Sequence, residues 1–511
     1  MSSSTLVTGG SWLTLILSMC LMTIVVLLLV RRGKFLYALR KVPYPPAFPI
    51  IGNAYQLCCS PEEAFKKMIK WGKELGDMYL IWVGMRPFIF LYKAEAIQPL
   101  LSSSVHIDKS LEYQYLHSWL GNGLVTSSGE KWHFHRKLLT PTFHSGLLEV
   151  YLKGTIREAQ ILISCLRKEV GKPEFDIVPY AKRATLDIIC DSSMGCNVNA
   201  QQNGENEYVL AVNTLASISQ RRFLNVWMSF DPIFKLTTWG KKHDHALRVT
   251  HGFSKLYVRT LIIAERKAEW KARKDGNFNE RSQKRQALLD LLLELSDDNR
   301  VLTDDDIRDE VNTFMFAGHD TTATSVSWIL YALGRHPQYQ EKILEEYYRV
   351  AGTKELSLEI LSKLTWLEAC IKESWRVYPV TPLIARQIYH PITILGHEIP
   401  IGSTVIINSF LLHRDPRYFP EPDTYRPERF LPNGPKYPSY AFVPFSAGSR
   451  NCIGWKYATM IVKVLILYIL KNFQVESLDT EDQLRFITEL VLYNADGLRL
   501  KITPRKNTII V

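Results

Sequence analysis

The hydrophobic residues of this chain first gather in one long apolar run near the N-terminus. Residues 12–30 contain no charged side chain. A helix of this length is about 28 Å long, which is close to the hydrocarbon thickness of a bilayer. The pattern therefore predicts a membrane-spanning helix at residues 12–30, preceded by a short N-terminal segment at residues 1–11.

The charges beside this run predict its orientation. Arg31, Arg32 and Lys34 follow at once, whereas no charged residue precedes them. Because positive charge marks the cytoplasmic side of a membrane helix, we expect the N-terminus in the lumen and the rest of the chain in the cytosol. A cleaved signal peptide is the alternative, but its basic flank would lie on the other side of the apolar run.

A basic, proline-rich stretch follows at residues 31–52 and contains Pro43, Pro45, Pro46 and Pro49. Proline stiffens a chain, so this stretch is expected to be a linker that holds a globular body at a fixed distance from the bilayer. An ordinary surface loop is the alternative. The globular, catalytic body is expected at residues 53–511.

Within the body, short β-rich runs are separated by long stretches of helical period. The β-rich runs lie at residues 78–84, 88–92, 392–395 and 404–408, and after Phe486. The fold class is therefore expected to be mainly α with a minor β portion, an α+β fold. A basic run at residues 266–285 is expected to be an exposed connection.

One predicted helix is unusually long. Residues 304–334 contain no proline, Pro337 ends the run, and Thr303 and Asp306 have capping-box spacing. Such a helix would be about 45 Å long and would cross the body. Its middle reads Ala-Gly-His-Asp-Thr-Thr at residues 317–322. Glycine and threonine are poor helix formers, which favours a local function over a kinked core helix.

Composition narrows the function classes. A chain of 511 residues can bury a core large enough to enclose a sizeable cofactor. The net charge of +11 favours acidic partners such as anionic lipid or an acidic protein. Nucleic acid is a weaker choice, because the chain has neither zinc-finger spacing nor an arginine-rich block. Eight cysteines are too few for a disulfide scaffold and favour a reducing compartment.

The clearest chemical signal runs from Phe445 to Gly454 and reads Phe-Ser-Ala-Gly-Ser-Arg-Asn-Cys-Ile-Gly. Cys452 precedes a periodic apolar run, so it is expected at a helix N-terminus, where the dipole and free N–H groups favour a thiolate. Gly448 allows close approach of backbone or of a flat cofactor, and Arg450 is placed to meet a carboxylate. A buried structural cysteine is the alternative.

This motif resembles the haem-binding loop of cytochrome P-450 enzymes, and the resemblance extends over nearly the whole chain. It implies the cytochrome P-450 fold and a haem-thiolate monooxygenase with haem b as cofactor and Cys452 as the axial iron ligand. Such an enzyme inserts one oxygen atom of O₂ into a C–H bond of a small apolar substrate. Its expected location is the endoplasmic reticulum membrane, crossed once, with the catalytic body facing the cytosol.

The same resemblance implies the partners. Electrons would come from NADPH through NADPH–cytochrome P-450 reductase, with cytochrome b5 left open as a second donor, and membrane lipid would hold the anchor. The basic residues Lys131, Lys137 and Lys456 are expected to guide the reductase to the Cys452 side. Nucleic acid is not expected as a partner.

Further residues match the family position by position. Glu373 and Arg376, in Glu-Ser-Trp-Arg, and Arg429, in Pro-Glu-Arg-Phe, resemble a buried ion network that fixes the cysteine loop. Residues that match haem-binding positions are Trp132, Arg136, Arg386, Phe445, Gly448, Arg450 and Gly454. For Trp132 and Arg136 the alternative is an amphipathic helix face, and for Arg386 it is a surface charge.

Asp320 and Thr321 match the family's acid–alcohol pair. The resemblance implies that Thr321 steadies the bound oxygen and its water, while Asp320 feeds protons from solvent. A widened helix at Gly318 would make room for oxygen.

The resemblance extends to arthropod members of family four, the fatty-acid omega-hydroxylase type, through segments 119–121, 139–143, 314–316, 318–322, 413–416 and 444–448. It implies terminal or near-terminal hydroxylation of fatty acids, terpenoid hormones or foreign lipophiles.

Three departures from that branch leave the class intact and the substrate open. Ala317 stands where many members carry a glutamate that is esterified to the haem, so the haem is expected to be non-covalent. Ser449 replaces a usual proline, and Tyr493-Asn494 replaces Arg-Pro on a loop that contacts substrate.

Three other function classes remain open. A haem-thiolate isomerase or dehydratase would need neither O₂ nor a reductase, but such branches often lack the acid–alcohol pair. A haem-based sensor or lipid carrier would need no proton relay, and a structural membrane protein would bind no haem.

Overall fold

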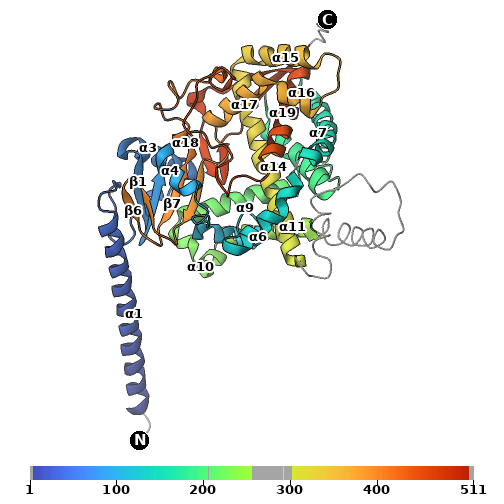
Figure 1. The fold of residues 1–511 in the computed structure, drawn as a ribbon. Coiled ribbons are helices and arrows are strands. Elements are labelled where there is room, and N and C mark those ends of the chain that lie inside the picture. The colour runs from blue at the N-terminus through green and yellow to red at the C-terminus, as the bar shows by residue number, and fades with distance from the viewer. Residues whose placement is uncertain (1–3, 144, 205, 256–291, 293–301, 506–511) are drawn as a thin grey trace.

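The computed structural model describes residues 4–143, 145–204, 206–255, 292 and 302–505 (Figure 1). The basic run at residues 266–285 lies outside these described residues. The described chain is mainly helical with small sheets, which confirms the predicted α+β class. The helices are α1 (Ser4–Ala38), α2 (Ala54–Leu57), α3 (Pro61–Leu75), α4 (Ala94–Leu101), α5 (His117–Leu120), α6 (Gly129–Leu139), α7 (Ser145–Leu166), α8 (Val178–Ile189), α9 (Glu207–Leu224), α10 (Asp231–Leu236), α11 (Thr238–Ser254), α14 (Asp304–Arg335), α15 (Pro337–Ala351), α16 (Leu358–Lys363), α17 (Thr365–Val377), α18 (Ser409–Leu412) and α19 (Trp455–Asn472).

Helix α14 runs through the middle of the body, as the sequence predicts (Figure 1). Its capping box is formed: the Asp306 backbone N–H donates to Thr303 Oγ1 at 3.1 Å, and the Thr303 N–H donates to the Asp306 carboxylate at 3.1 Å. These two bonds satisfy N–H groups that the first turn would leave without partners. The helix ends at Arg335, two residues before Pro337, where α15 begins.

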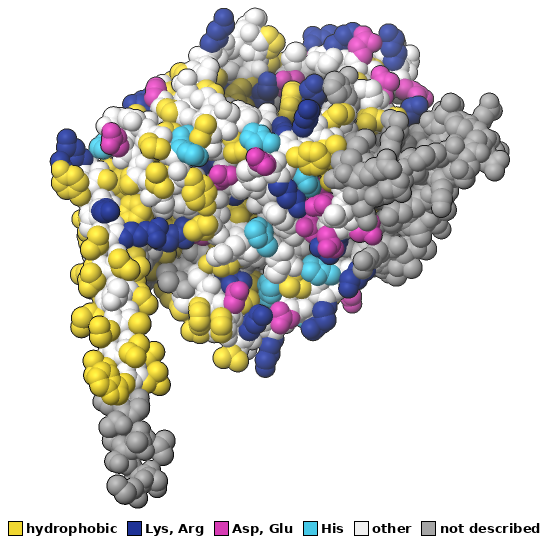
Figure 2. Space-filling view, turned by 60° about the horizontal axis from the view of Figure 1, so that its bottom comes forward, with side chains coloured by type: hydrophobic (Ala, Val, Ile, Leu, Met, Phe, Trp, Pro, Cys, Tyr) yellow, Lys and Arg dark blue, Asp and Glu magenta, His cyan; other side chains and the backbone are white. Residues whose placement is uncertain are grey.

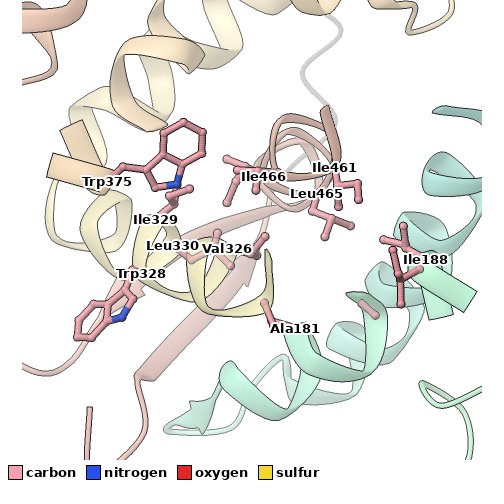
Figure 3. Close-up of a cluster of buried hydrophobic side chains, with 14 of the residues drawn as sticks. Ala181, Ile188, Val326, Trp328, Ile329, Leu330, Trp375, Ile461, Leu465 and Ile466 are labelled. Atoms are coloured by element: carbon pink, nitrogen blue, oxygen red, sulfur yellow. The ribbon is translucent and has the colours of Figure 1, made fainter. Parts of the chain in front are cut away.

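The core forms where α14 meets α8 and α19 (Figure 3). Val326, Ile329 and Leu330 of α14 are buried there together with Leu465 of α19 and Ile188 of α8. Close packing of these apolar side chains fixes the three helices relative to one another, and the site described below lies beside them.

Every predicted β-rich run contains a strand, and the structure has further strands at residues 175–176, 383–387, 397–399 and 473–477 that were not predicted. The strands are β1 (Met78–Val83), β2 (Arg86–Leu91), β3 (Phe175–Asp176), β4 (Leu383–Gln387), β5 (Ile392–Ile394), β6 (His397–Ile399), β7 (Thr404–Asn408), β8 (Phe473–Ser477), β9 (Phe486–Glu489), β10 (Val491–Asn494) and β11 (Arg499–Pro504). The largest sheet has the order β1-β2-β7-β4, in which only β2 and β7 are parallel. The β9–β10 pair is an antiparallel hairpin.

Helix α1 projects from the body and is long and apolar enough to cross a membrane (Figure 1). Figure 2 shows hydrophobic side chains over this helix and basic side chains near its junction with the body. The helix continues past the expected end at Val30 to Ala38, so Arg31, Arg32 and Lys34 lie on the helix itself.

The expected linker at residues 31–52 is therefore helical as far as Ala38, and part of it packs against the body. Phe35, Leu39 and Val42 are buried in the same apolar cluster as Leu80 and Trp82 of β1. The proline-rich part is also bonded to the body, because the Leu80 N–H donates to the Pro43 carbonyl at 2.9 Å. Burial of these apolar side chains holds the segment against the body.

Candidate active site

A cavity of about 310 Å³ lies between α14 and the loop that precedes α19. Its volume is within the range of small-molecule and cofactor sites. Most of the residues singled out in the sequence line it: Trp132, Arg136, Ala317, Thr321, Arg386, Phe445, Arg450, Cys452 and Gly454. These residues come from four separate parts of the chain, so the fold brings the candidate site together.

Cys452 opens onto this cavity from the loop before α19. Its backbone N–H donates to the Phe445 carbonyl at 2.9 Å, which closes the loop. The helix starts later than expected, at Trp455, because Gly454 takes a non-helical conformation as N-cap. Burial raises the pKa of the Cys452 thiol, while the Gly454 N–H and the positive charge of Arg136 lower it. Both opposing groups stabilise a thiolate.

Gly448 lets the cysteine loop pack closely against the backbone at Leu101, and it does not line the cavity described above. Its φ is +72°, and a Cβ atom there would collide with the Leu101 carbonyl oxygen. Of the two uses expected for this glycine, the close approach of backbone is therefore the one observed.

Arg136 holds the cysteine loop from the side of α6. Its guanidinium donates to the Asn451 carbonyl at 2.7 Å and to the Asn451 side-chain oxygen at 2.7 Å. Trp132, one helical turn earlier, is buried under Arg450, whose guanidinium carbon lies 4.8 Å from the ring centroid. Both residues thus support the wall of the cavity.

Three cations converge on the cavity without an anion to balance them. Arg386, Arg450 and Lys109 line it, and none of them forms an ion pair with any carboxylate among the described residues. Arg450 donates to the Ile107 carbonyl at 3.0 Å and to the Ser127 carbonyl at 2.5 Å. Burial, and next to it the charge of Arg386, lowers the pKa of Arg450 to about 9.

Buried charges without partners are costly, so this cluster favours a ligand that carries carboxylates. Burial also lowers the pKa of Lys109, with smaller effects from Arg386 and Arg450. The cluster therefore fits the propionate groups of haem. Lys109 was not found from the sequence, because no motif marks it and only the folded chain places it beside the two arginines.

The expected ion network is formed and fully buried. The Arg376 guanidinium donates to both carboxylate oxygens of Glu373 at 2.8 Å, and Arg429 Nε lies 3.4 Å from the same carboxylate. Arg376 also donates to the His413 carbonyl at 3.0 Å, and the His413 ring accepts from the Val443 N–H at 3.0 Å. The network is thus connected to the segment that leads into the cysteine loop.

On the opposite wall, Ala317 and Thr321 of α14 face the cavity. The Thr321 hydroxyl donates to the Ala317 carbonyl at 2.6 Å. The helix is continuous through Gly318, and the widening expected there stays a prediction. Gly318 lets α8 approach, because a Cβ atom there would lie 2.5 Å from Cδ1 of Ile189.

Asp320 is 0% exposed and lines neither of the two cavities described. Its Oδ1 lies 2.9 Å from Lys182 Nζ and accepts from the Tyr493 hydroxyl at 2.6 Å. Burial raises the pKa of Asp320, but the charges of Lys182 and His319 and the Tyr493 hydrogen bond outweigh it and lower the pKa. Asp320 therefore does not contact solvent directly, and protons from solvent would reach it through neighbouring groups.

A second, mainly apolar cavity of about 300 Å³ adjoins the first and shares Lys109, Ala317 and Thr321 with it. Its apolar walls include Phe88, Phe90, Phe316, Leu490 and Val491. Thr321 therefore lies where the apolar cavity meets the Cys452 cavity.

Comparisons with known proteins agree with this arrangement. A family model described as Cytochrome P450 matches residues 42–502. The chain is 38% identical over 519 aligned residues to Cytochrome P450 4c3 of Drosophila melanogaster, covering 98% of this chain and 96% of that protein. It is 40% identical over 471 residues to human Cytochrome P450 4V2, covering 90% and 89%. Cytochrome P450 4d2 of Drosophila melanogaster is 37% identical over 484 residues, covering 93% and 95%.

Proposed function

Because the chain belongs to the cytochrome P450 family of haem monooxygenases, we propose that it inserts one oxygen atom of O₂ into a C–H bond of a long apolar substrate, and that Cys452 would be the residue that binds the haem iron. The observation that carries this proposal is one cavity whose lining contains Cys452, Thr321 and three cations that form no ion pair with a carboxylate among the described residues.

Each wall of the cavity has its own task. Cys452 would bind the iron, and Lys109, Arg386 and Arg450 would bind the propionates. Bound haem supplies oxygen activation, which a thiolate ligand favours by promoting O–O cleavage. Thr321 would hold a water molecule at the opposite wall.

The ion network of Glu373, Arg376 and Arg429 has a structural task in this proposal. It connects to the chain before the cysteine loop and so would keep Cys452 in place. Asp320 would supply the protons that the reaction consumes.

The substrate is proposed to be a fatty acid, a terpenoid hormone or a foreign lipophile, because the adjoining cavity is lined mainly by apolar side chains. Members of family four are fatty-acid hydroxylases. The apolar walls would exclude water and hold a C–H bond near Thr321.

The location and the partners are proposed from helix α1 and from the exposed basic residues. Helix α1 would anchor the chain in the endoplasmic reticulum membrane, with the basic residues Arg31 and Arg32 on the cytosolic side. An NADPH-dependent flavoprotein reductase would dock on the Cys452 side, near the exposed residues Lys137 and Lys456. Lys131 is less suited to this task than expected, since it forms an ion pair with Asp306 at 2.7 Å. Cytochrome b5 stays open as a second electron donor.

Isotope labelling tests this function. The full-length protein is reconstituted in vesicles with reductase and NADPH, and dodecanoic acid, a terpenoid and a fluorogenic ether serve as probes. We expect product only in the complete system, with one labelled oxygen atom when the gas is ¹⁸O₂ and none when the label is in water. Turnover of a peroxide probe without O₂ or reductase, together with no labelled product, would instead identify an isomerase.

A further inference from the structure

A closed set of hydrogen bonds joins Asp320 of α14 to Lys182 of α8 and Tyr493 of β10. Lys182 Nζ lies 2.9 Å from Asp320 Oδ1 and 2.8 Å from the Tyr493 hydroxyl oxygen, which itself lies 2.6 Å from the same Oδ1. An ammonium group has donors only, so the Tyr493 oxygen accepts from Lys182. Its own O–H is therefore left to donate to Asp320.

Tyr493 is the member of this set that reaches outward. Asp320 and Lys182 are 0% and 3% exposed, whereas Tyr493 is only partly buried. The Lys182 ammonium also donates to the partly buried Asn213 side chain. Asp320 Oδ2 has no protein partner among the described residues, so one carboxylate oxygen is held and the other is free.

The strand that carries Tyr493 also contacts the apolar cavity. Leu490 and Val491 line that cavity, and Val491 and Tyr493 lie on the same face of β10 because side chains alternate along a strand. The Trp328 indole of α14 donates to the Leu492 carbonyl at 2.8 Å, which fixes the strand against the helix. Tyr493 is therefore held rigidly beside Asp320.

We propose that Tyr493 is a positioning residue that holds the Asp320 carboxylate and connects it to solvent during proton delivery. The inference rests on the proposed monooxygenase function. When Asp320 passes a proton inward, its carboxylate regains one from the Tyr493 hydroxyl, which takes one from solvent water, while the Lys182 ammonium keeps its hydrogen bond to the Tyr493 oxygen. One proton moves inward, and only O–H bonds are exchanged.

The hydrogen bond also predicts a pH effect. The groups that influence Asp320 come from every element packed around it, namely Lys182, Tyr208, His319, Glu489 and Tyr493. Donation from Tyr493 stabilises the ionised carboxylate and so lowers the pKa of Asp320. Removing the phenol oxygen should raise that pKa, so any acid limb of proton delivery should move to higher pH.

Tyr493→Phe tests the proposal, with Tyr180→Phe as the matched control. Tyr180 donates to the Glu169 carboxylate at 2.7 Å, on α8 but outside the lining of both cavities. In the full-length enzyme with reductase, we expect Tyr493→Phe to lower product formed per NADPH several-fold. We also expect it to enlarge the solvent deuterium isotope effect and to move the acid limb upward in pH. The control should behave as wild type, and Lys182→Gln should reproduce the Tyr493→Phe defect.

A second readout does not depend on turnover. Thermal loss of the haem absorbance is compared for Tyr493→Phe, Asp320→Asn and the double variant, whose midpoint shifts should be non-additive if the two side chains interact. Unchanged coupling, isotope effect and acid limb in Tyr493→Phe, with an intact carbon monoxide spectrum, would overturn the inference and leave the monooxygenase standing. A wild type without a carbon monoxide band would refute the proposed function instead.

Discussion

The Arg376 guanidinium donates two hydrogen bonds of 2.8 Å to the Glu373 carboxylate, and neither side chain exposes any surface. The Arg426 backbone N–H donates to the same carboxylate at 2.8 Å. Bidentate geometry and full burial make each partner dependent on the other, because either charge alone would be left in a low-dielectric interior.

Glu373→Gln should therefore destabilise the protein strongly. Removal of one partner from a buried ion pair typically costs about 3–5 kcal/mol, and the free energy of unfolding from denaturant titration measures the loss. Glu359→Gln, which removes an exposed pair with Lys363, serves as the control and should leave the unfolding midpoint unchanged. Equal effects of the two substitutions would show that the buried network does not hold the fold.

Thr321→Ala should separate haem binding from proton handling. The hydroxyl lies on the cavity wall, so its loss is expected to leave the carbon monoxide spectrum intact and to increase peroxide released per NADPH. Ser327→Ala is the matched control, because Ser327 makes the same bond to the carbonyl four residues earlier but lines neither cavity. Wild-type peroxide yield in Thr321→Ala would assign the role to another group or to water alone.

The haem should be released by acid and organic solvent. The lining of the Cys452 cavity contains no aspartate or glutamate in the described part of the chain, and Ala317 offers only a methyl group. An ester to the haem therefore has no carboxylate to form from. Haem that co-elutes with the polypeptide in denaturing chromatography would contradict this prediction, and Ala317→Glu provides the comparison.

The small side chain of Ala317 also leaves room beside the cavity. Wild type is expected to hydroxylate several carbons near the end of a fatty acid, whereas Ala317→Glu should narrow the product range. Product analysis decides between these outcomes, and exclusive terminal alcohol from wild type would speak against the prediction.

Electron transfer from the reductase should weaken as ionic strength rises, because salt screens exposed charges. Lys137→Glu and Lys456→Glu should slow it further, since both lysines are exposed and neither forms an ion pair in the described structure. Stopped-flow reduction at several salt concentrations measures the effect. Electron-transfer rates that change neither with salt concentration nor on charge reversal would rule out this docking surface.

The features that were predicted correctly are those marked by a short, local sequence pattern. The capping box at Thr303 and the proline-free run set the limits of α14, and the spacing of Glu373 and Arg376 places them on one helix face. The cysteine loop is contiguous, so its motif could be found without knowledge of the fold.

The remaining features depend on contacts between distant segments. Tyr493 and Asp320 are 173 positions apart, and Lys109 acquires its neighbours only when the chain folds. The continuation of α1 to Ala38 depends on burial of Phe35 against the sheet, and Gly318 serves the approach of α8. Periodicity and motifs contain no information about such partners.

Ligation of the haem iron by Cys452 is tested most directly by the carbon monoxide difference spectrum of the reduced full-length protein. Wild type should give the long-wavelength band that characterises thiolate ligation, and Cys452→His should lose it. Cys58→Ser, at an exposed cysteine away from the cavity, should keep it. A wild-type protein without that band, or a Cys452→His variant that retains it, would contradict the assignment.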